Sequence, residues 1–308
     1  MSSLRSIKDK IRSVGKTHQV TKAMEAVSGV KMRKAQLAAL SARPYALAAF
    51  RILLRIVNSV DISRHRLVLP RPVEKMLVII ITSDKGLAGG LNSGTEKCAL
   101  EALAVKGIAL ENTGIIAIGH KGEEFFTHRG YILEEHIETK KDESTLADFT
   151  GVVSLITNLF TRGEYDECVL VYTAFRSTFE QEPVLRTLLP LSVEGLRGMV
   201  EGIVPKHGKF AELNDHLDVE EHPKNYLFEP SPEVVFETLL PHLLAIEIYH
   251  AFLEEKASEH SARMVAMRNA SDKASEVTFS LTREYNKARQ SAITSEMSEI
   301  IGGMEAMK

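Results

Sequence analysis

The chain has 308 residues, of which 44% are hydrophobic and 26% charged, and its formal net charge is −3. This composition is typical of an ordinary folded protein and excludes a disordered or collagen-like chain. The two cysteines, Cys98 and Cys168, match neither a CxxC pair nor a metal-site spacing, so we expect buried free thiols in a reducing compartment. Residues 1–13 lack the apolar core of a secretory signal, and we expect the chain to be used from residue 1. No continuous run of about 18 apolar residues is present, so the sequence predicts no transmembrane segment.

Residues 1–60 have the pattern of one long helix. Apolar side chains recur at steps of three and four, and Pro44 is the only proline, a place where the helix could kink. The apolar positions with this spacing are Leu4, Ile7, Ile11, Val14 and then Val20, Met24 and Val27.

The same segment is strongly basic. Residues 1–43 contain ten basic and two acidic side chains, a net charge of +8, which predicts an acidic partner. A solvated helix face would show the same pattern. Nucleic acid would also fit the charge, but residues 1–43 contain no aromatic side chain that could stack on bases.

The middle of the chain alternates strand-like and helix-like segments after a linker at 61–72. This alternation predicts a Rossmann-like α/β domain with a largely parallel sheet at 73–205, followed by an irregular, His-rich connection at 206–231. The expected strands are 75–82, 114–119 and 166–174, and the expected helices are 95–106 and 145–162.

A glycine-rich loop, "SDKGLAGGLN" at 83–92, follows the first of these strands. Gly86, Gly89 and Gly90 do not have the Gly-x-Gly-x-x-Gly spacing of a dinucleotide site, and no P-loop Lys-Ser/Thr follows them. The "GKT" at 15–17 lies in a helix and lacks the first glycine of a P-loop. We therefore read the loop as a tight strand-to-helix turn. We expect no direct nucleotide binding, no catalytic residues, no cofactor and no metal site in this chain.

Residues 232–308 predict a second long helix, because Pro241 lies in its first turns and the next glycine is Gly302. More than 60 residues of helix correspond to roughly 90 Å. Apolar and small side chains keep a heptad step throughout, which indicates a coiled-coil seam. We expect its histidines, His250 and His260, to be packed in the seam rather than to bind metal. The seam positions are Leu239, Leu243, Ile246, His250, Leu253, Ala257, His260, Met264, Met267, Ser271, Ala274, Thr278, Leu281, Tyr285 and Ala288.

These two helices are expected to pair as an antiparallel two-helix coiled coil with the α/β domain inserted between them. Five blocks that run in order along the chain add a resemblance to this pattern. The blocks are "VTKAMEAVSGVKMRKAQ" (20–36), "SDKGLAGGLN" (83–92), "YLFEPSPE" (226–233), "SEHSARMVAMRNASDKASE" (258–276) and "EYNKARQSAITSEMSEIIGG" (284–303). In these blocks the chain resembles the gamma subunit of F-type rotary ATP synthases.

The resemblance implies a central-stalk rotor that couples proton flow through a membrane c-ring to ATP synthesis or hydrolysis. Its implied partners are the alpha and beta subunits of the catalytic ring, the epsilon subunit and the c-ring, and it implies no nucleic acid. The Cys pair of the plant-type regulatory insertion is absent, which favours a peripheral protein on the cytoplasmic side of a bacterial plasma membrane. The residues that the resemblance places against the alpha/beta ring are Lys22, Met24, Arg33, Arg289, Gln290 and Thr294.

Two other classes of protein fit parts of the pattern. One is a small-molecule enzyme whose α/β domain has long helical arms, and the other is a basic coiled-coil protein that binds nucleic acid. The sequence also departs from the family at Gly29, where a helix-interior glycine costs about 1 kcal/mol relative to alanine and leaves the local rigidity of the helix open.

Overall fold

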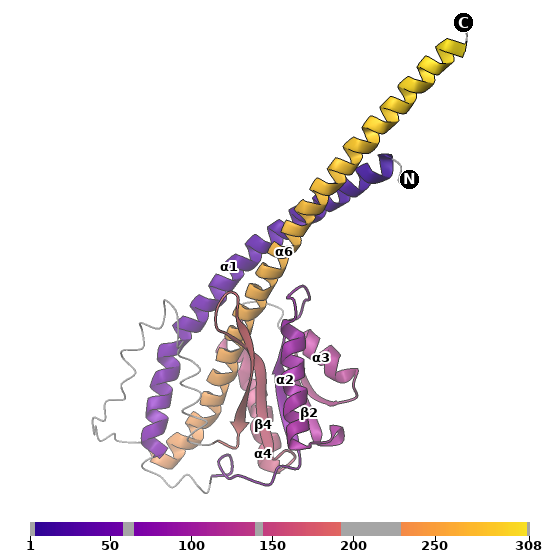
Figure 1. Ribbon diagram of the computed structural model, residues 1–308. Coiled ribbons are helices and arrows are strands. Elements are labelled where there is room, and N and C mark those ends of the chain that lie inside the picture. Colours follow the sequence, from indigo (N-terminus) through magenta and orange to yellow (C-terminus); the bar gives the residue numbers. More distant parts are fainter. Residues whose placement is uncertain (1–3, 58–64, 139–143, 192–228, 307–308) are drawn as a thin grey trace. The chain divides into compact units, whose positions relative to one another are not determined.

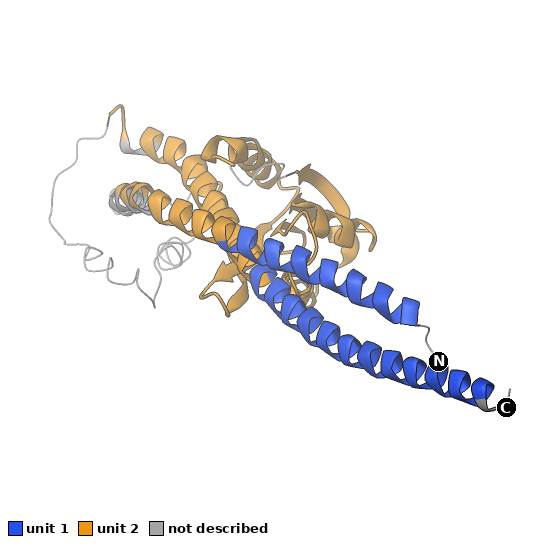
Figure 2. Cartoon of the chain, turned by 90° about the horizontal axis from the view of Figure 1, so that it is seen from above, with its two compact units in different colours: residues 1–29, 263–308 blue, residues 30–262 orange. Residues whose placement is uncertain are grey.

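The chain forms two compact units in the computed structural model. Unit 1 consists of Met1–Gly29 with Arg263–Lys308, and unit 2 consists of Val30–Ala262 (Figure 2). The residues that the structure describes are 4–57, 65–138, 144–191 and 229–306.

Two long α-helices begin and end the described chain: α1 (Leu4–Val57) with 54 residues and α6 (Pro232–Ala306) with 75 (Figure 1). Both were expected from the spacing of apolar residues. Each helix contains one proline in its interior, Pro44 in α1 and Pro241 in α6.

In unit 1 the first part of α1 lies beside the part of α6 that begins at Arg263, and the two run antiparallel; the last part of α6 extends beyond the start of α1 (Figures 1 and 2). The α6 side chains that are buried or half-buried recur at steps of three and four, which confirms the predicted seam in this part of the helix. These positions are Met264, Met267, Ser271, Ala274, Thr278, Leu281, Tyr285 and Ala288.

In the second half of the apolar pattern of α1, the apolar residues do not coincide with the buried positions. Val20 is 57% exposed and Val27 is 55% exposed, whereas Thr21 and Ser28 are buried. The three-four step that starts at Leu4 reaches positions 18, 21, 25 and 28, so polar side chains occupy the seam, and the two that are fully buried, Thr21 and Ser28, are small. Beyond Val14 the apolar spacing of α1 therefore does not follow its heptad.

Gly29 continues this small-residue seam. A Cβ atom at Gly29 would lie 3.2 Å from the sulfur of Met264, so glycine lets α1 and α6 approach closely in unit 1. The close approach gives a physical reason for a residue that otherwise weakens a helix.

Unit 2 is built on a five-stranded sheet with the strand order β3-β2-β1-β4-β5. The first four strands in sequence are parallel to their neighbours, and the edge strand β5 runs antiparallel to β4. A largely parallel sheet was predicted, although β3 and β5 themselves were not. The strands are β1 (Met76–Ile81), β2 (Thr113–Ile118), β3 (Ile132–Ile137), β4 (Glu167–Phe175) and β5 (Gln181–Leu189).

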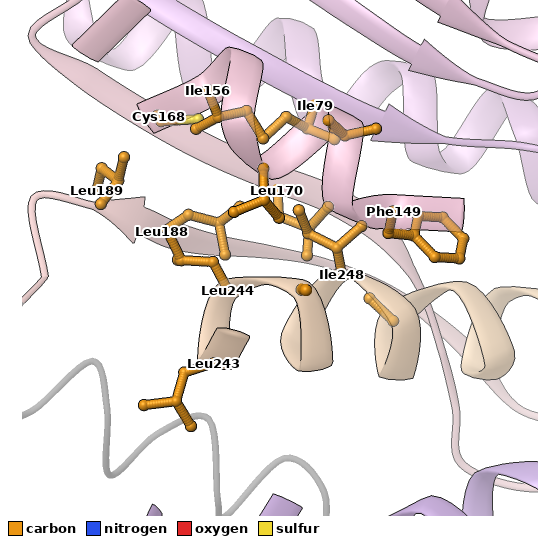
Figure 3. Packing of buried hydrophobic residues seen from close by; sticks show 14 of the residues in the cluster. Ile79, Phe149, Ile156, Cys168, Leu170, Leu188, Leu189, Leu243, Leu244 and Ile248 are labelled. Carbon is orange, nitrogen blue, oxygen red and sulfur yellow. The ribbon is translucent and has the colours of Figure 1, made fainter. Parts of the chain in front are cut away.

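Helices cover both faces of this sheet. The α2 helix (Leu91–Lys106) and α3 (His120–Thr127) pack on one face, where the alternate β1 residues Met76, Val78 and Ile80 are buried. The α4 helix (Thr150–Arg162) and α6 pack on the other face, against Ile79 and its neighbours (Figure 3). Because every β1 residue is buried, the strand reads as a continuous apolar run.

The boundaries of the helices in unit 2 differ modestly from those predicted. The α2 helix begins four residues earlier, and residues 145–149 lie outside α4, mostly in the 3₁₀ helix η3 (Leu146–Phe149). A second 3₁₀ helix, η2 (Leu110–Asn112), precedes β2. The short helix α3 was not predicted. Most of the predicted connection 206–231 lies outside the described residues, and the division of the chain at 60, 73, 205 and 232 stays a prediction.

The α6 helix also bears on the expectation that no segment could span a membrane. Val234–Met304 contains an 18-residue window with a mean hydropathy of 1.2, which is long and apolar enough for a span by length and composition alone. This window was not predicted, because it is apolar on average and not a continuous run of apolar residues. In the structure, 56% of the window is buried inside the protein, as in the core helix of many soluble domains.

Gly119 connects β2 to α3 where the chain passes closest to β1. Its φ is +100°, and a Cβ atom there would run into the backbone carbonyl oxygen of Thr82. Backbone atoms cannot move aside as a flexible side chain can, so only glycine fits this position.

We therefore expect Gly119→Ala to lower the free energy of unfolding by about 3 kcal/mol or more, from backbone strain and the clash with Thr82. Gly151→Ala is the matched control, because Gly151 lies in α4 with no atom within 4 Å of an added Cβ. It should leave the stability unchanged or raise it by up to about 1 kcal/mol. Urea unfolding of the full chain measures both, and equal midpoints for the two variants would contradict this account.

Candidate functional site

The α1 residues expected to contact a partner do not share one environment. Lys22 is exposed, and its ammonium group lies 3.0 Å from the carboxylate of Glu25, three residues further along the helix. Met24 is half-buried, so its side chain is partly packed within unit 1 and partly accessible. Arg33 is exposed and belongs to unit 2. Lys22 and Met24 are two residues apart, so they project from nearly opposite sides of α1.

The α6 residues expected at the same surface are Arg289, Gln290 and Thr294, and all three are exposed. The Thr294 hydroxyl donates a hydrogen bond of 2.9 Å to the backbone carbonyl of Gln290. Gln290 and Thr294 share a face of the helix, while Arg289 projects about 100° away. A partner that touches all three must curve around the helix.

An apolar stripe next to these residues was missed by the sequence reasoning. Every residue from 289 to 304 is exposed in the described structure, including five large apolar side chains that are 48–63% exposed. Their spacing of four, three, one and three places them on one side of α6, a pattern that the sequence contains. Exposed apolar surface of this kind marks an interaction site. The stripe consists of Ile293, Met297, Ile300, Ile301 and Met304.

The basic end of α1 offers a second exposed apolar feature. Val20 and Val27, which the seam does not bury, are seven residues apart and therefore lie on one side of the helix. Unit 1 thus presents apolar side chains from both of its helices, interspersed with basic and amide groups.

In unit 2 the glycine-rich loop forms the turn that was predicted between β1 and α2. Gly89 has φ +62°, and the Ser83 amide donates to Asn92 Oδ1 across the loop at 3.1 Å. Leu87 was not singled out, yet it has φ +67° and is 61% exposed. A leucine in the left-handed backbone conformation costs on the order of 1–2 kcal/mol. The hydrogen bonds of the surrounding loop hold the backbone of Leu87 in this conformation.

The α6 helix meets the carboxyl end of β4 through buried polar contacts. The backbone N–H of Thr173 donates to Glu255 Oε2 at 2.6 Å, and the Ser258 hydroxyl donates to the Thr173 carbonyl at 3.1 Å. Glu255 and Ser258 are both fully buried. Burial raises the pKa of Glu255 to about 8, although the hydrogen bond from Thr173 opposes this shift.

A second buried contact joins α6 to the loop after β1. Lys256 Nζ lies 2.9 Å from Glu259 Oε2 and 4.0 Å from Asp84 Oδ2, and the side chains of Lys256 and Glu259 are each 5% exposed. Burial lowers the pKa of Lys256, but the neighbouring carboxylates, Glu259 first, outweigh burial and the net pKa is raised. Lys256 is therefore a buried cation that stays charged.

Glu247 is buried where α6 faces the sheet, and neither of its carboxylate oxygens has a hydrogen-bond partner in the described part of the chain. Burial raises its pKa to about 8, and only the positive charge of Arg186 on β5 opposes this shift. The groups that its charge influences are Cys168 and Tyr172 of β4. Below about pH 8 this carboxyl is therefore protonated in the folded chain.

The thiols and histidines complete the list of reactive groups. Cys168 is buried and Cys98 is half-buried, and both are free, as expected. His250 and His260 are buried in α6. Within the described ranges, no group of three or more His, Cys, Asp or Glu side chains is arranged to hold a metal ion.

Comparisons with known sequences agree on one family. A family model described as ATP synthase matches residues 3–307. The chain is similar to the ATP synthase gamma chain of Moorella thermoacetica, with 36% identity over 308 residues and 100% of both chains covered. It is 39% identical over 312 residues to the ATP synthase gamma chain of Aromatoleum aromaticum, again with 100% of both chains covered.

Solved structures resemble the fold. A chain of the Euglena gracilis mitochondrial ATP synthase (OSCP/F1/c-ring, rotational state 3) gives a TM-score of 0.62 at 19% identity, covering 99% of this chain and 94% of that one. A chain of the Tetrahymena thermophila mitochondrial ATP synthase (central stalk/c-ring) gives 0.58 at 21% identity, covering 82% and 99%.

The environment of Glu247 predicts that the free energy of unfolding depends on pH. Because its folded-state pKa, about 8, lies above the ordinary value of 4.5, the stability that it contributes is fully present below about pH 4.5 and is lost as the pH rises to 8. We expect Glu247→Gln to stabilise the chain relative to the parent by an amount that grows over this window, on the order of 1 kcal/mol per pH unit. Urea unfolding at pH 5, 6.5 and 8 measures the difference.

Glu101→Gln is the control, because the Glu101 side chain is 63% exposed. Its stability relative to the parent should stay nearly constant over the same pH range. A Glu247→Gln difference that is equally constant would show that this carboxyl does not titrate as the burial implies.

Proposed function

The chain belongs to the ATP synthase gamma-chain family, and on that basis we propose that it is the central-stalk rotor subunit of an F-type ATP synthase. In this role it turns inside a ring of alpha and beta subunits and couples proton flow through a membrane c-ring to ATP synthesis or hydrolysis. The observation that supports the role best is the full-length match of the chain to gamma chains, together with the antiparallel coiled coil of unit 1.

Unit 1 has the physical properties of an axle. Its two helices differ in sequence, so its cross-section is asymmetric, and identical catalytic sites around it cannot all make the same contacts at once. Differential contacts of this kind shift the populations of the conformational states of each site and hence its nucleotide affinity. The asymmetry therefore supports a rotor that drives sequential changes.

The exposed surface of unit 1 fits a sleeve of partner subunits. We assign Lys22, Met24, Arg289, Gln290 and Thr294, with Arg33 on the unit 2 part of α1, to contacts with the alpha/beta ring. The apolar stripe from Ile293 to Met304 supplies buried area in the same contact, at about 25 cal/mol per Å² removed from water. The net charge of +8 in residues 1–43 favours acidic loops on the beta subunits.

The remaining features of the role are part of the same proposal. The chain has no catalytic site of its own and binds no nucleotide, which agrees with the absence of the phosphate-binding motifs from the sequence. Epsilon and the c-ring are its further partners, and the location is the cytoplasmic side of a bacterial plasma membrane.

Assembly of the full chain with alpha, beta and epsilon subunits tests the proposal. We expect the chain to be retained in the complex through gel filtration, and the membrane-reconstituted complex to pump protons when ATP is added. The pure chain alone should show no saturable ATP binding. Retention of alpha and beta in an active, pumping complex from which the chain has been omitted would refute the proposed role.

Arg289 and Gln290 provide the sharper test of the contact surface. Each polar contact contributes on the order of 1 kcal/mol net, so replacing both residues by alanine should slow multi-site ATP hydrolysis roughly five- to thirtyfold. The helix itself should persist, because alanine favours helices more than either residue.

Glu284→Ala is the control on the same helix. Glu284 is exposed, and it projects from a different side of α6 than Arg289 and Gln290. Complexes with normal subunit stoichiometry should hydrolyse ATP at the parental rate when they contain Glu284→Ala. Equal rates for the double variant and the control would remove Arg289 and Gln290 from the contact.

A further inference from the structure

The order of strands in unit 2 defines a crevice where α/β domains commonly bind ligands. From β1 the chain continues to β2 on one side, and β4 pairs with β1 on the other, so the topology switches direction between β1 and β4. In open α/β sheets the ligand site lies at this switch point, beyond the carboxyl ends of the two strands.

In this chain α6 occupies that position. Glu255 and Ser258 bond the N–H and the carbonyl of Thr173, near the carboxyl end of β4. One turn further, the Ser261 hydroxyl donates to the carbonyl of Thr178 in the turn after β4, at 2.8 Å. Backbone groups that a ligand would meet in a nucleotide-binding domain are thus bonded to a helix of the same chain.

Lys256 makes the corresponding connection at the end of β1. Its ammonium group lies between Glu259 of α6 and Asp84, the third residue after β1. The other carboxylate oxygen of Asp84 accepts the backbone N–H of His120, the first residue of α3, at 3.1 Å. One buried cation therefore links α6 to the loops that follow both β1 and β2.

We propose that Lys256 is a positioning residue that fixes the rotational setting of α6 on the α/β domain. The inference rests on the proposed rotor function, since a fixed setting is what allows torque on the α/β domain to turn the helix. The α6 helix continues as one assigned helix from unit 2 into unit 1, so a rotation imposed on its residues 255–261 is passed along the helix.

The contacts differ in the kind of constraint that they supply. Apolar packing of α6 on the sheet, through Leu244, Ile248 and Phe252, favours burial but is non-directional. The contact between the buried Lys256 ammonium and Asp84 is directional, because rotating the helix would separate these charges; Glu259 lies on α6 itself and would move with Lys256. Lys256 therefore opposes slippage of the helix on the sheet more than apolar packing of similar area does.

The test uses two variants in the full complex. Lys256→Met keeps most of the length of the side chain and removes its charge, but it also removes the ammonium that lies 2.9 Å from the buried Glu259. The double variant Lys256→Met with Glu259→Gln also removes that carboxylate charge, so it relieves most of the burial penalty while the link to Asp84 stays broken. Lys97→Met, on the exposed Lys97–Glu101 pair of α2, is the control for loss of a positive charge.

Two readouts separate positioning from simple stabilisation. The first is the number of protons pumped per ATP hydrolysed, measured only on complexes with normal subunit stoichiometry. The second is hydrogen exchange at the amide of His120, which Asp84 holds. We expect both Lys256 variants to pump about half as many protons per ATP, or fewer, and to exchange the His120 amide roughly tenfold faster or more.

Lys97→Met should match the parent in both readouts. A purely stabilising role for Lys256 predicts that the added Glu259→Gln restores coupling to the parental value, and that result would overturn the proposal. Parental coupling in Lys256→Met itself would overturn it as well. Failure of the proposed function looks different, because the parent chain would then fail to assemble or to support pumping at all.

Discussion

The structure depends on one constraint: α6 contributes side chains to the hydrophobic core of unit 2 and is also one of the two helices of the coiled coil in unit 1. Between residues 243 and 261 nearly every position is buried, whereas from 289 to 304 every described position is exposed. A helix that is buried all round needs apolar or paired polar groups on every side. A single exposed helix needs helix-forming residues and local pairs instead, such as Lys273–Glu276 at 2.8 Å. The sequence of α6 changes along its length accordingly.

Around residues 21–29 of α1, small side chains occupy the seam of the coiled coil in unit 1. Thr21, Ser28 and Gly29 on α1, with Ser271 and Ala274 on α6, occupy buried or half-buried positions where many coiled coils have leucine. Small side chains bring the helices close together and give many dispersion contacts while burying little apolar area. Several large apolar groups, Val20 and those of the stripe from Ile293 to Met304, are exposed on the outside, whereas others such as Ile7 and Met267 are buried in the seam. This division suits an element whose outer surface is its working surface.

The sequence was sufficient for the features that depend on long, regular patterns. The two long helices, the strands β1, β2 and β4, and the glycine turn could be predicted because apolar periodicity and glycine spacing are local signals. The edge strands β3 and β5 were missed for a physical reason. An edge strand is paired on one side only, and side chains such as Glu134, Glu135 and Glu182 break the apolar run that identifies a central strand.

The residues of the contact surface could likewise be predicted only in part from the sequence. Arg289, Gln290 and Thr294 could be placed on the exposed surface of a helix from their spacing and the resemblance, and the structure leaves them exposed. The exposure of Val20 and Val27 could not be predicted, because hydrophobicity does not reveal the phase of a heptad whose buried positions are polar. Lys256 could not be recognised at all. Its distant partner, Asp84, lies 172 positions earlier, and no periodic pattern connects residues that only the tertiary fold brings together.

The buried acids of α6 show that burial by itself does not give a charged residue a structural role. Glu255 and Glu247 are both buried with a pKa raised to about 8, but only Glu255 bonds the backbone of the sheet. A hydrogen bond to Thr173 has a direction, so Glu255 helps to specify where α6 lies along β4, even though its burial opposes ionisation. Glu247 has no such partner and contributes no direction; it is accommodated because protonation removes the charge that the interior disfavours. The setting of the helix is therefore determined by the few buried groups that have partners on the sheet, and the apolar surface around them determines only that the helix is buried.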